Sequence, residues 1–580
     1  CKYNLARFAK TDATTKHRRV LQSLCDGIHW CYKPTDASAE CDTLRVYFVA
    51  ELRSSLVKMH AASMRAGQSP LAAFEENLKF VRTSMPNAVD TLFQIECWWQ
   101  SVELTPPLCT ISLQTWLIEV SCHVLVMSLR FRAANDAAKA LEFADRWFSG
   151  QSSVSQSLKQ YHLIIKCFSL LRTGATKGMG PLVDELKALR TQEEGVSSVK
   201  EFGDGPVLDN IVDALDLEVT SRSDCKQAIT LSMKAIHSVQ ANMHIYAAGS
   251  DVHTFLTGLL FDMLYIHCDL QRQQCRFFEM GASIAQLLKI FIAYKHHLEL
   301  TSIAPYYVAQ IHTLIAKYAF GIGRQREGDA HVRTAVQHFL PAINADDNAY
   351  PLHFLRLWVD LLDATTHCSG AADSAFMSAI EGQSSDVQVI QVCPTAAQLN
   401  LAAQILQSPN LRKVVYSAGN LELRAKYDLF LCKWLWATQE LRSCGATRGL
   451  QPQEALEALR PDMQQLLDES LKLTIAHVKC SEATSEIMAL YGSKLIEAGH
   501  PENGENTLKD ALRISIHTKN ILLQVRLLVD VFRVYTHRQL IQAQATTADN
   551  YTKKIQQLHR RISQAQAEQA ATATILAWSS

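Results

Sequence analysis

The chain has 580 residues, 48% of them hydrophobic and 20% charged, which is ordinary for a folded protein and excludes a disordered one. Its 57 Lys and Arg residues balance 57 Asp and Glu residues. A protein that mainly grips phosphate backbones carries a basic excess, so strong direct binding to nucleic acid is disfavoured.

Glycine and proline are scarce, with 23 and 15 residues respectively. These two residues break helices and mark turns, so their scarcity favours long helices joined by short loops. A chain of this length exceeds what one ordinary core supports. We therefore expect either several domains or an elongated array of helical repeats.

Cysteine usage and hydropathy indicate the compartment. None of the 16 cysteines forms a C-x-x-C pair, and most lie among apolar neighbours, where a thiol behaves as a small hydrophobe. We expect buried, reduced cysteines and a nuclear or cytosolic protein. Asp262 and His267 interrupt the most apolar run, around 259–266, so we expect a soluble chain without a membrane span.

Residues 1–100 predict N-terminal helical hairpins, and they contain the candidate contacts for a partner. A helix in this region must end before Pro34, because the residue before a proline disfavours the helical conformation. Trp30 and Tyr32 therefore stand at a helix end. Such side chains either pack in the core or contact a partner, and both interpretations stay open.

Residues 101–380 predict a central set of irregular repeats. In the unit 115–148, Ala137, Ala140 and Ala144 follow one face of the second helix. Small residues there let two antiparallel helices approach closely, as in a tetratricopeptide (TPR) hairpin. A second unit of this kind spans 307–339, with its turn at 321–323.

Residues 381–541 predict C-terminal TPR-like repeats, of which 485–515 has the clearest pattern. Gly492 occupies the small position of the first helix and Gly499 the turn, while Leu508 and Ala511 take the large and small positions of the second helix. The spacing fits the TPR period of about 34 residues. Recurrence of such units predicts an all-α fold, a TPR-like helical-hairpin superhelix (an α–α solenoid), continuous over residues 1–580.

Residues 542–580 predict a polar capping helix and tail. The segment is rich in Gln, Ala and Thr and keeps a thin apolar stripe of Tyr551, Ile555, Leu558 and Ile562. A helix packed by so narrow a face suits the polar end that a solenoid needs.

The sequence contains no motif that carries chemistry. The glycine-rich stretch 174–180 lacks the residue order of a phosphate-binding loop. Neighbouring pairs such as His267-Cys268 point about 100° apart on a helix, so they do not readily chelate one ion together. We therefore predict a non-enzymatic protein with no cofactor and no metal.

Two stretches of this sequence resemble the TPR subunit of the cohesin loader (the cohesin-loading factor family). The C-terminal match runs through 466–528, with a Gly-His turn at 499–500 and the motif Ala511-Leu512-Arg513-Ile514-Ser515 in the helix that follows the turn. The N-terminal match covers residues 3–24 and an aromatic-Lys-Pro exit at 32–34. Val525-Arg526 departs from the family pattern, and the region 150–300 shows no clear match, so the resemblance is to a divergent member.

The resemblance implies a scaffold whose inner channel wraps the extended N-terminal segment of the large HEAT-repeat loader subunit. Such a heterodimer supports cohesin loading on chromatin and sister-chromatid cohesion, and it implies a nuclear, chromatin-associated protein, with the cytoplasm as a second compartment. Contacts with cohesin and chromatin would be indirect. No partner-binding residue of the family transfers by position.

Three other interpretations stay open on the sequence. The chain resembles equally well, in architecture alone, a scaffold of the anaphase-promoting complex or of a proteasome-lid-like assembly, because fold does not fix the partner. An enzyme within a helical shell would need a pocket with converging acid–base groups. Accessory DNA binding would use the basic residues at 17–19 and in the C-terminal helix.

Overall fold

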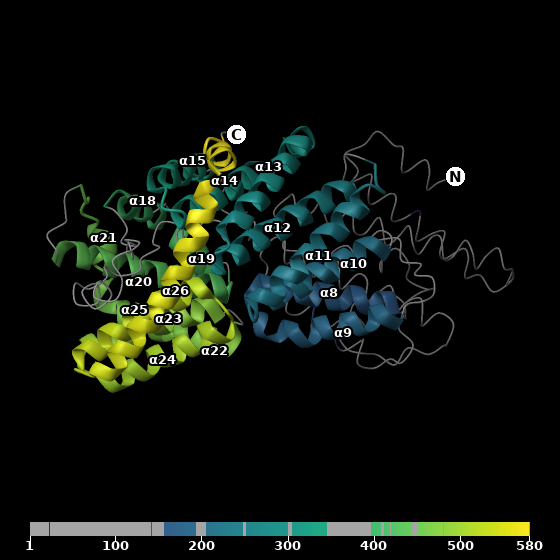
Figure 1. The fold of residues 1–580 in the computed structure, drawn as a ribbon. Helices are drawn as coiled ribbons and strands as arrows, with labels where there is room; N and C mark the ends of the chain where they lie inside the picture. The colour runs from purple at the N-terminus through teal and green to yellow at the C-terminus, as the bar shows by residue number, and fades with distance from the viewer. Residues whose placement is uncertain are drawn as a thin grey trace. The chain divides into compact units, whose positions relative to one another are not determined.

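The computed structural model describes residues 156–192, 205–247, 251–299, 304–344, 396–407, 411–417, 419–443, 449–478 and 481–578, with isolated positions at 23, 141 and 145 (Figure 1). Within these ranges every regular element is a helix and no strand occurs. The predicted all-α, helical-hairpin fold is confirmed. The chain divides into two compact units, one of 1–169 with 188–199 and the other of 170–187 with 200–580.

The helices follow one another in closely spaced antiparallel pairs. The first part of the described chain contains α8 (Gln156–Thr173), η1 (Thr176–Gly178), α9 (Met179–Gln192), α10 (Gly205–Ser221), α11 (Cys225–Met243), α12 (Asp251–Gln273), α13 (Phe277–Glu299), α14 (Ala304–Gly321) and α15 (Gln325–Asn344). The second part contains α18 (Ala396–Leu406), α19 (Leu411–Ser417), α20 (Leu421–Ser443), α21 (Glu454–Glu457), η2 (Arg460–Asp462), α22 (Met463–His477), α23 (Ser481–Glu497), α24 (Pro501–His517), α25 (Ile521–His537), α26 (Ile541–Ala567) and α27 (Gln569–Leu576).

Neighbours in sequence are neighbours in space, as a repeat architecture requires. From α10 to α15 each helix packs on the next, and the same holds from α22 to α26. A hairpin of two amphipathic helices cannot bury its apolar face alone. Each hairpin therefore packs that face against the next hairpin.

Five connections between these helices use the same three-residue turn. In each, the middle residue has a positive φ: Cys275, Gly323, Gly499, Lys519 and Gln539. The backbone N–H after it bonds to the carbonyl five residues back, as in His500 N–H to Leu495 O at 2.8 Å. This is the Schellman termination, which satisfies the last carbonyls of one helix and starts the next at once.

The hairpin α23–α24 follows the prediction for 485–515. Gly492 in α23 lies against Gly504 in α24, where an added Cβ at Gly492 would meet the Gly504 carbonyl oxygen at 3.0 Å. Leu508 and Ala511 are buried, and Gly499 forms the turn. The predicted positions are confirmed, and Gly504 adds a second close-approach residue that the sequence argument did not single out.

The hairpin α14–α15 likewise confirms the unit predicted at 307–339. Ala316, Ala319 and Ala335 are fully buried, and the turn contains Gly323 at φ +81. The unit predicted at 115–148 lies almost wholly outside the described residues. The predicted division into N-terminal, central, C-terminal and capping parts stays a prediction.

Gly499→Ala tests the turn geometry. The added Cβ meets open space, but φ is +86, so we expect the free energy of unfolding of the α23–α24 hairpin to fall by about 1 kcal/mol. Gly180→Ala, in α9, also adds its Cβ to open space, without a positive φ, and we expect it to be neutral or slightly stabilising. Amide hydrogen exchange measures both variants. If Gly499→Ala and Gly180→Ala changed amide protection equally, the positive φ of Gly499 would have no energetic cost for alanine.

Among the described helices, one segment is long and apolar enough to cross a bilayer, by length and composition alone. It is Phe277–Lys295 in α13, with a mean hydropathy of 1.3, and not the run around 259–266 that the sequence argument named. Met280, Ile284, Leu287 and Phe291 of this segment are buried inside the protein, as expected for a core helix.

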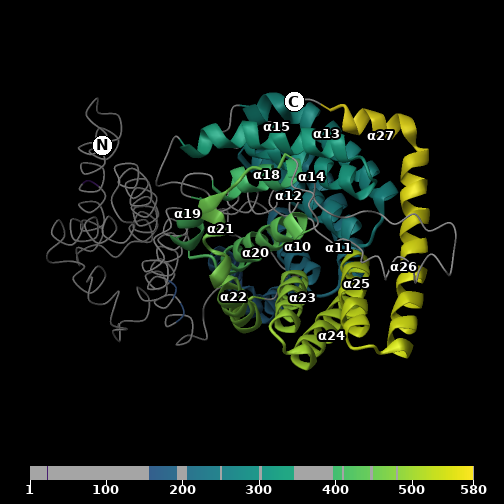
Figure 2. The ribbon, with the colours of Figure 1, turned by 90° about the vertical axis from the view of Figure 1, so that its left-hand side faces the viewer.

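The C-terminal helix α26 has the predicted narrow apolar face. Tyr551, Ile555, Leu558 and Ile562 are buried, while the residues between them are mostly exposed. Helix α26 packs on α25 and on α13 (Figure 2). The predicted helix and its stripe are confirmed.

Candidate functional site: a polar seam between helix ends

Helix ends that are far apart in sequence meet along one line, which we call the seam. Its members are Arg222, Asp224, Cys225, Asp269, Arg272, Gln273 and Gln274 on one side and Asn420, Glu422, Glu482, Lys519 and Asn520 on the other. Contacts across the seam join residues 200 to 295 positions apart. All belong to the unit of 170–187 and 200–580.

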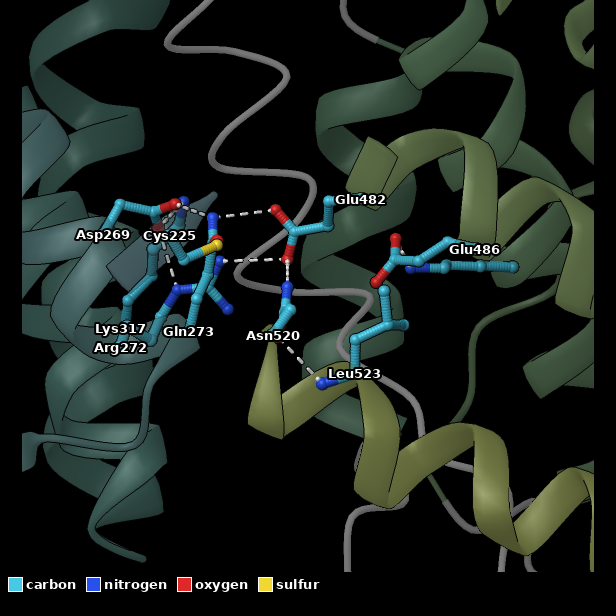
Figure 3. A network of polar contacts seen from close by, with 10 residues as sticks. Cys225, Asp269, Arg272, Gln273, Lys317, Glu482, Glu486, Asn520 and Leu523 are labelled. Carbon is cyan, nitrogen blue, oxygen red and sulfur yellow. Dashed lines mark hydrogen bonds and ion pairs between the residues drawn. The ribbon is translucent and has the colours of Figure 1, made fainter. Parts of the chain in front are cut away.

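Glu482, at the start of α23, is the centre of the seam (Figure 3). Its carboxylate accepts hydrogen bonds from Gln273 Nε2 at 3.0 Å and from Asn520 Nδ2 at 3.2 Å. Arg272 Nη2 lies 3.8 Å from the same carboxylate. One side chain therefore connects α12, α23 and the turn before α25.

Asp269 anchors the other side of this network. Its carboxylate accepts from Arg272 Nε at 2.8 Å and from Gln273 Nε2 at 2.9 Å, and Lys317 Nζ of α14 lies 3.5 Å away. Arg272 and Lys317 have only 5% of their side-chain surface exposed. Two buried cations thus face two carboxylates, those of Asp269 and Glu482, which offsets much of the cost of removing the charges from water.

Two asparagines have a double role at the seam. Asn520 caps α25 by accepting from Leu523 N–H at 3.0 Å while its amide donates to Glu482. Asn420 caps α20 by accepting from Leu423 N–H at 2.9 Å, and its amide donates to the carbonyls of Leu171 and Arg172. The side chain that starts each helix therefore also attaches it to a distant helix end.

Further ion pairs extend the seam in both directions. Arg222 Nη2 lies 3.1 Å from Glu422, and both side chains are at least nine-tenths buried. Lys519 bonds to Asp224. Burial alone would raise the pKa of the Asp224 carboxyl, but hydrogen bonds from Lys519 and from two backbone N–H groups outweigh it and lower that pKa.

The cysteines of the described chain are buried free thiols, as predicted: Cys167, Cys225, Cys268, Cys275 and Cys432. Cys225 lies in the seam and donates to Gln273 Oε1 at 3.0 Å. Burial raises the pKa of the Cys225 thiol to about 12. It is a neutral donor at physiological pH and not a nucleophile.

The pair His267-Cys268 does not form a metal site. His267 Nδ1 lies 2.7 Å from Ser232 Oγ, and its Nε2 lies 2.8 Å from Gln271 Nε2. Burial lowers the pKa of His267 to about 4, so the ring is neutral and held by polar neighbours. Within the described ranges, no group of three or more His, Cys, Asp or Glu residues is placed to hold a metal ion.

Asp428 is a buried carboxyl whose pKa is raised. Burial raises its pKa to about 6, although Tyr416 donates to it at 2.6 Å and Ser470 at 3.5 Å. The three residues belong to α20, α19 and α22, which they join. A shifted pKa is a reason to look for catalysis, but these contacts are those of a buried structural carboxyl.

Two sets of residues named from the sequence remain, the candidate partner contacts and the basic groups. Trp30, Tyr32 and the basic stretch 17–19 lie outside the described residues. In the C-terminal helix, Lys553 bonds to Asp549 at 2.6 Å and Arg561 donates to the Gln274 carbonyl, so both basic groups have protein partners.

The glycine-rich stretch 174–180 packs against another helix. Gly174 adopts φ +70, and an added Cβ would lie 2.6 Å from the backbone nitrogen of Glu422. The stretch thus abuts the start of α20 at the seam and does not cradle a phosphate.

None of the seam residues was predicted as functional. The asparagine caps carry a local signal, because Asn is a preferred residue before a helix. The contacts of their amide groups with distant helix ends have no such signal in the sequence, because no short-range pattern connects those residues.

No protein-family description and no curated protein matches the chain. Among solved structures, it is similar to the Rap protein complexed with competence and sporulation factor, at 9% identity over 77% of this chain and 99% of that chain, with a TM-score of 0.41. It is also similar to a circular tandem repeat protein, at 11% identity over 96% of this chain and 99% of that chain, with a TM-score of 0.19. The fold assignment rests on the helices described above.

Proposed function

We propose that this chain is a non-enzymatic scaffold that holds an extended segment of another protein, and that this partner is the large HEAT-repeat subunit of the cohesin loader. In this proposal the chain works in the nucleus, as one half of a heterodimer that supports cohesin loading and sister-chromatid cohesion. Its contacts with cohesin and chromatin are indirect.

The observation that carries the proposal is the hairpin α23–α24 with its continuation into α25. The resemblance to the loader subunit is clearest in this part of the sequence. The close glycine contact at Gly492, the turn at Gly499 and the buried Ala511 occupy the places that a TPR hairpin requires. The family assignment itself rests on the sequence resemblance.

The chemistry of the described residues supports a binding role over a catalytic one. The buried charged groups of the seam form ion pairs or hydrogen bonds with one another, and the described thiols are buried. Stacked helical hairpins present an extended surface, on which a disordered ligand can bury a large area as it becomes ordered.

The test is affinity purification of the tagged full chain from nuclei, followed by quantitative mass spectrometry. We expect one large HEAT-repeat protein at near-equal stoichiometry, with cohesin subunits in smaller amounts. Recovery of a many-subunit ubiquitin ligase or a proteasome-lid-like complex would overturn the loader assignment and keep the scaffold role. Recovery of the tagged chain alone would overturn both.

A second measurement uses the purified chain with the N-terminal segment of the HEAT-repeat subunit. At 100 times the dissociation constant, a ligand that binds only the folded state adds about 2.7 kcal/mol to stability, so the melting midpoint should rise. A peptide of the same composition in scrambled order is the control. An unchanged midpoint at saturating segment would contradict the proposal.

A further inference from the structure

The chain's C-terminus folds back onto the hairpins of its central part. After packing on α25, helix α26 reaches the turns of the central hairpins, where Arg561 donates to the Gln274 carbonyl and Gln566 donates to the Ile322 carbonyl at 2.8 Å. Figure 2 shows α26 running along α25 and ending where α27 turns over α13. The two acceptors lie in the α12–α13 and α14–α15 turns.

The short helix α27 then contacts α13, α14 and α15. Thr572 and Ile575 are buried, and the Thr572 hydroxyl lies 3.2 Å from that of Tyr318 in α14. His331 of α15 lies with its Nε2 3.0 Å from the Leu576 carbonyl oxygen.

Trp578 completes these contacts two residues after α27 ends. Its ring centroid lies 4.6 Å from that of His312 in α14 and 6.0 Å, edge to face, from that of Phe291 in α13. Residues 572, 575 and 578 are three apart, so they follow one face of a helix and its end. These three residues therefore form one stripe that ends on an aromatic side chain.

The surface that receives α27 is ordered by its own hydrogen bonds. His331 donates through Nε2 to the Leu576 carbonyl, so in the neutral ring its Nδ1 is an acceptor. His312 Nδ1, 2.8 Å away, is then the donor between the two rings. These two hydrogen bonds fix one tautomer for each histidine, and they direct the His331 Nε2 donor at the last turn of α27.

We propose that this surface of α13, α14 and α15 is a binding site for a short helix tipped by tryptophan, and that α27 with Trp578 is its tethered, reversibly bound occupant. Three features separate α27 from α26. The backbone breaks at Glu568, which is exposed and has φ −82 and ψ 57. An isolated helix of eight residues is not stable in water, so α27 forms only where it is bound.

The third feature is the difference in contact area between the two helices. Among the side chains that the structure describes, eight of α26 are buried, whereas in α27 and the residues after it Thr572 and Ile575 are buried and Leu576 and Trp578 are half-buried. Occupancy of so small a site depends on the tether, which keeps the ligand at a high local concentration. A free peptide should therefore compete only when the tethered copy is weakened.

The test uses the full chain with Trp578→Ala and a fluorescent peptide of residues 566–578. In hydrogen exchange, the amides of α27 should exchange at least about tenfold faster in the variant, while those of α26 keep their protection. In fluorescence anisotropy, the peptide should bind the variant at least about tenfold more tightly than it binds the unaltered chain, whose site is occupied. The same peptide carrying Ala in place of Trp should not bind.

Ile541→Ala is the matched control, because Ile541 is a large apolar residue at the start of α26 with 78% of its surface exposed. It should leave both readouts unchanged. Thr572→Ala, which removes the contact with Tyr318, is a second variant and should shift both readouts in the direction of Trp578→Ala. The proposal is overturned if the peptide binds no variant, or if α26 loses protection together with α27.

Discussion

Replacing Arg272 by methionine should reduce the protection of α12, α23 and α25 amides by about 100-fold, which corresponds to a loss of about 2.7 kcal/mol in the local free energy of opening. Arg272 is buried, bonds to Asp269 and faces Glu482 across the seam. Methionine fills much of the same volume but leaves two carboxylates with fewer cations. Lys317 remains beside Asp269 and limits the loss.

The chain contains a closely matched control for this substitution. Arg513 pairs with Asp510 three residues before it at 2.7 Å, as Arg272 pairs with Asp269 at 2.8 Å, but 78% of the Arg513 side chain is exposed against 5% for Arg272. An exposed pair contributes little, so Arg513→Met should change stability by no more than about 0.5 kcal/mol. Equal effects of the two substitutions would show that the seam contributes nothing beyond an ordinary surface pair.

Gly504→Ala should destabilise the α23–α24 hairpin by about 2–3 kcal/mol. A Cβ at this position would lie 2.6 Å from the Gly492 carbonyl oxygen and 2.4 Å from Ile496 Cγ1. Ile496 could move, but the carbonyl belongs to a helix backbone, so the two helices must separate. Separation would weaken the packing of Ala489, Leu508 and Leu523 in the same cluster.

Amide exchange and denaturant unfolding of the full chain measure this effect, with Gly180→Ala as the control. Gly180 is also helical, and its added Cβ meets nothing within 4 Å, so alanine there removes only the flexibility of glycine. If Gly504→Ala left the protection of α23 and α24 unchanged, the close contact between the two helices would be wrong.

The elements that the sequence predicted are those specified by short-range pattern. In 485–515, a glycine, a turn and a pair of large and small apolar residues all lie within the TPR period of about 34 residues. They specify both helices and the contact between them. The apolar stripe of α26 was predicted for the same reason. Its helical spacing is visible in the sequence, and the stripe is buried.

The turns were predicted only where glycine marks them. Gly323 and Gly499 predict a residue in the left-handed conformation, because glycine adopts positive φ without a steric cost. Cys275, Lys519 and Gln539 adopt the same conformation and give no such signal. The hydrogen bonds of the Schellman turn and the packing of the flanking helices maintain their conformation against its cost.

The sequence by itself determined that this protein is all-α, that its helices pair into hairpins with small residues at the close contacts, and that its C-terminal helix buries one narrow stripe. These features follow from the 3.6-residue period and from the chemistry of glycine, which act over a few turns of chain. The tertiary structure alone decided that Glu482 meets Gln273 and that Trp578 meets His312. Each of these contacts depends on the summed rotation of many successive hairpins, and no local pattern in the chain encodes that sum.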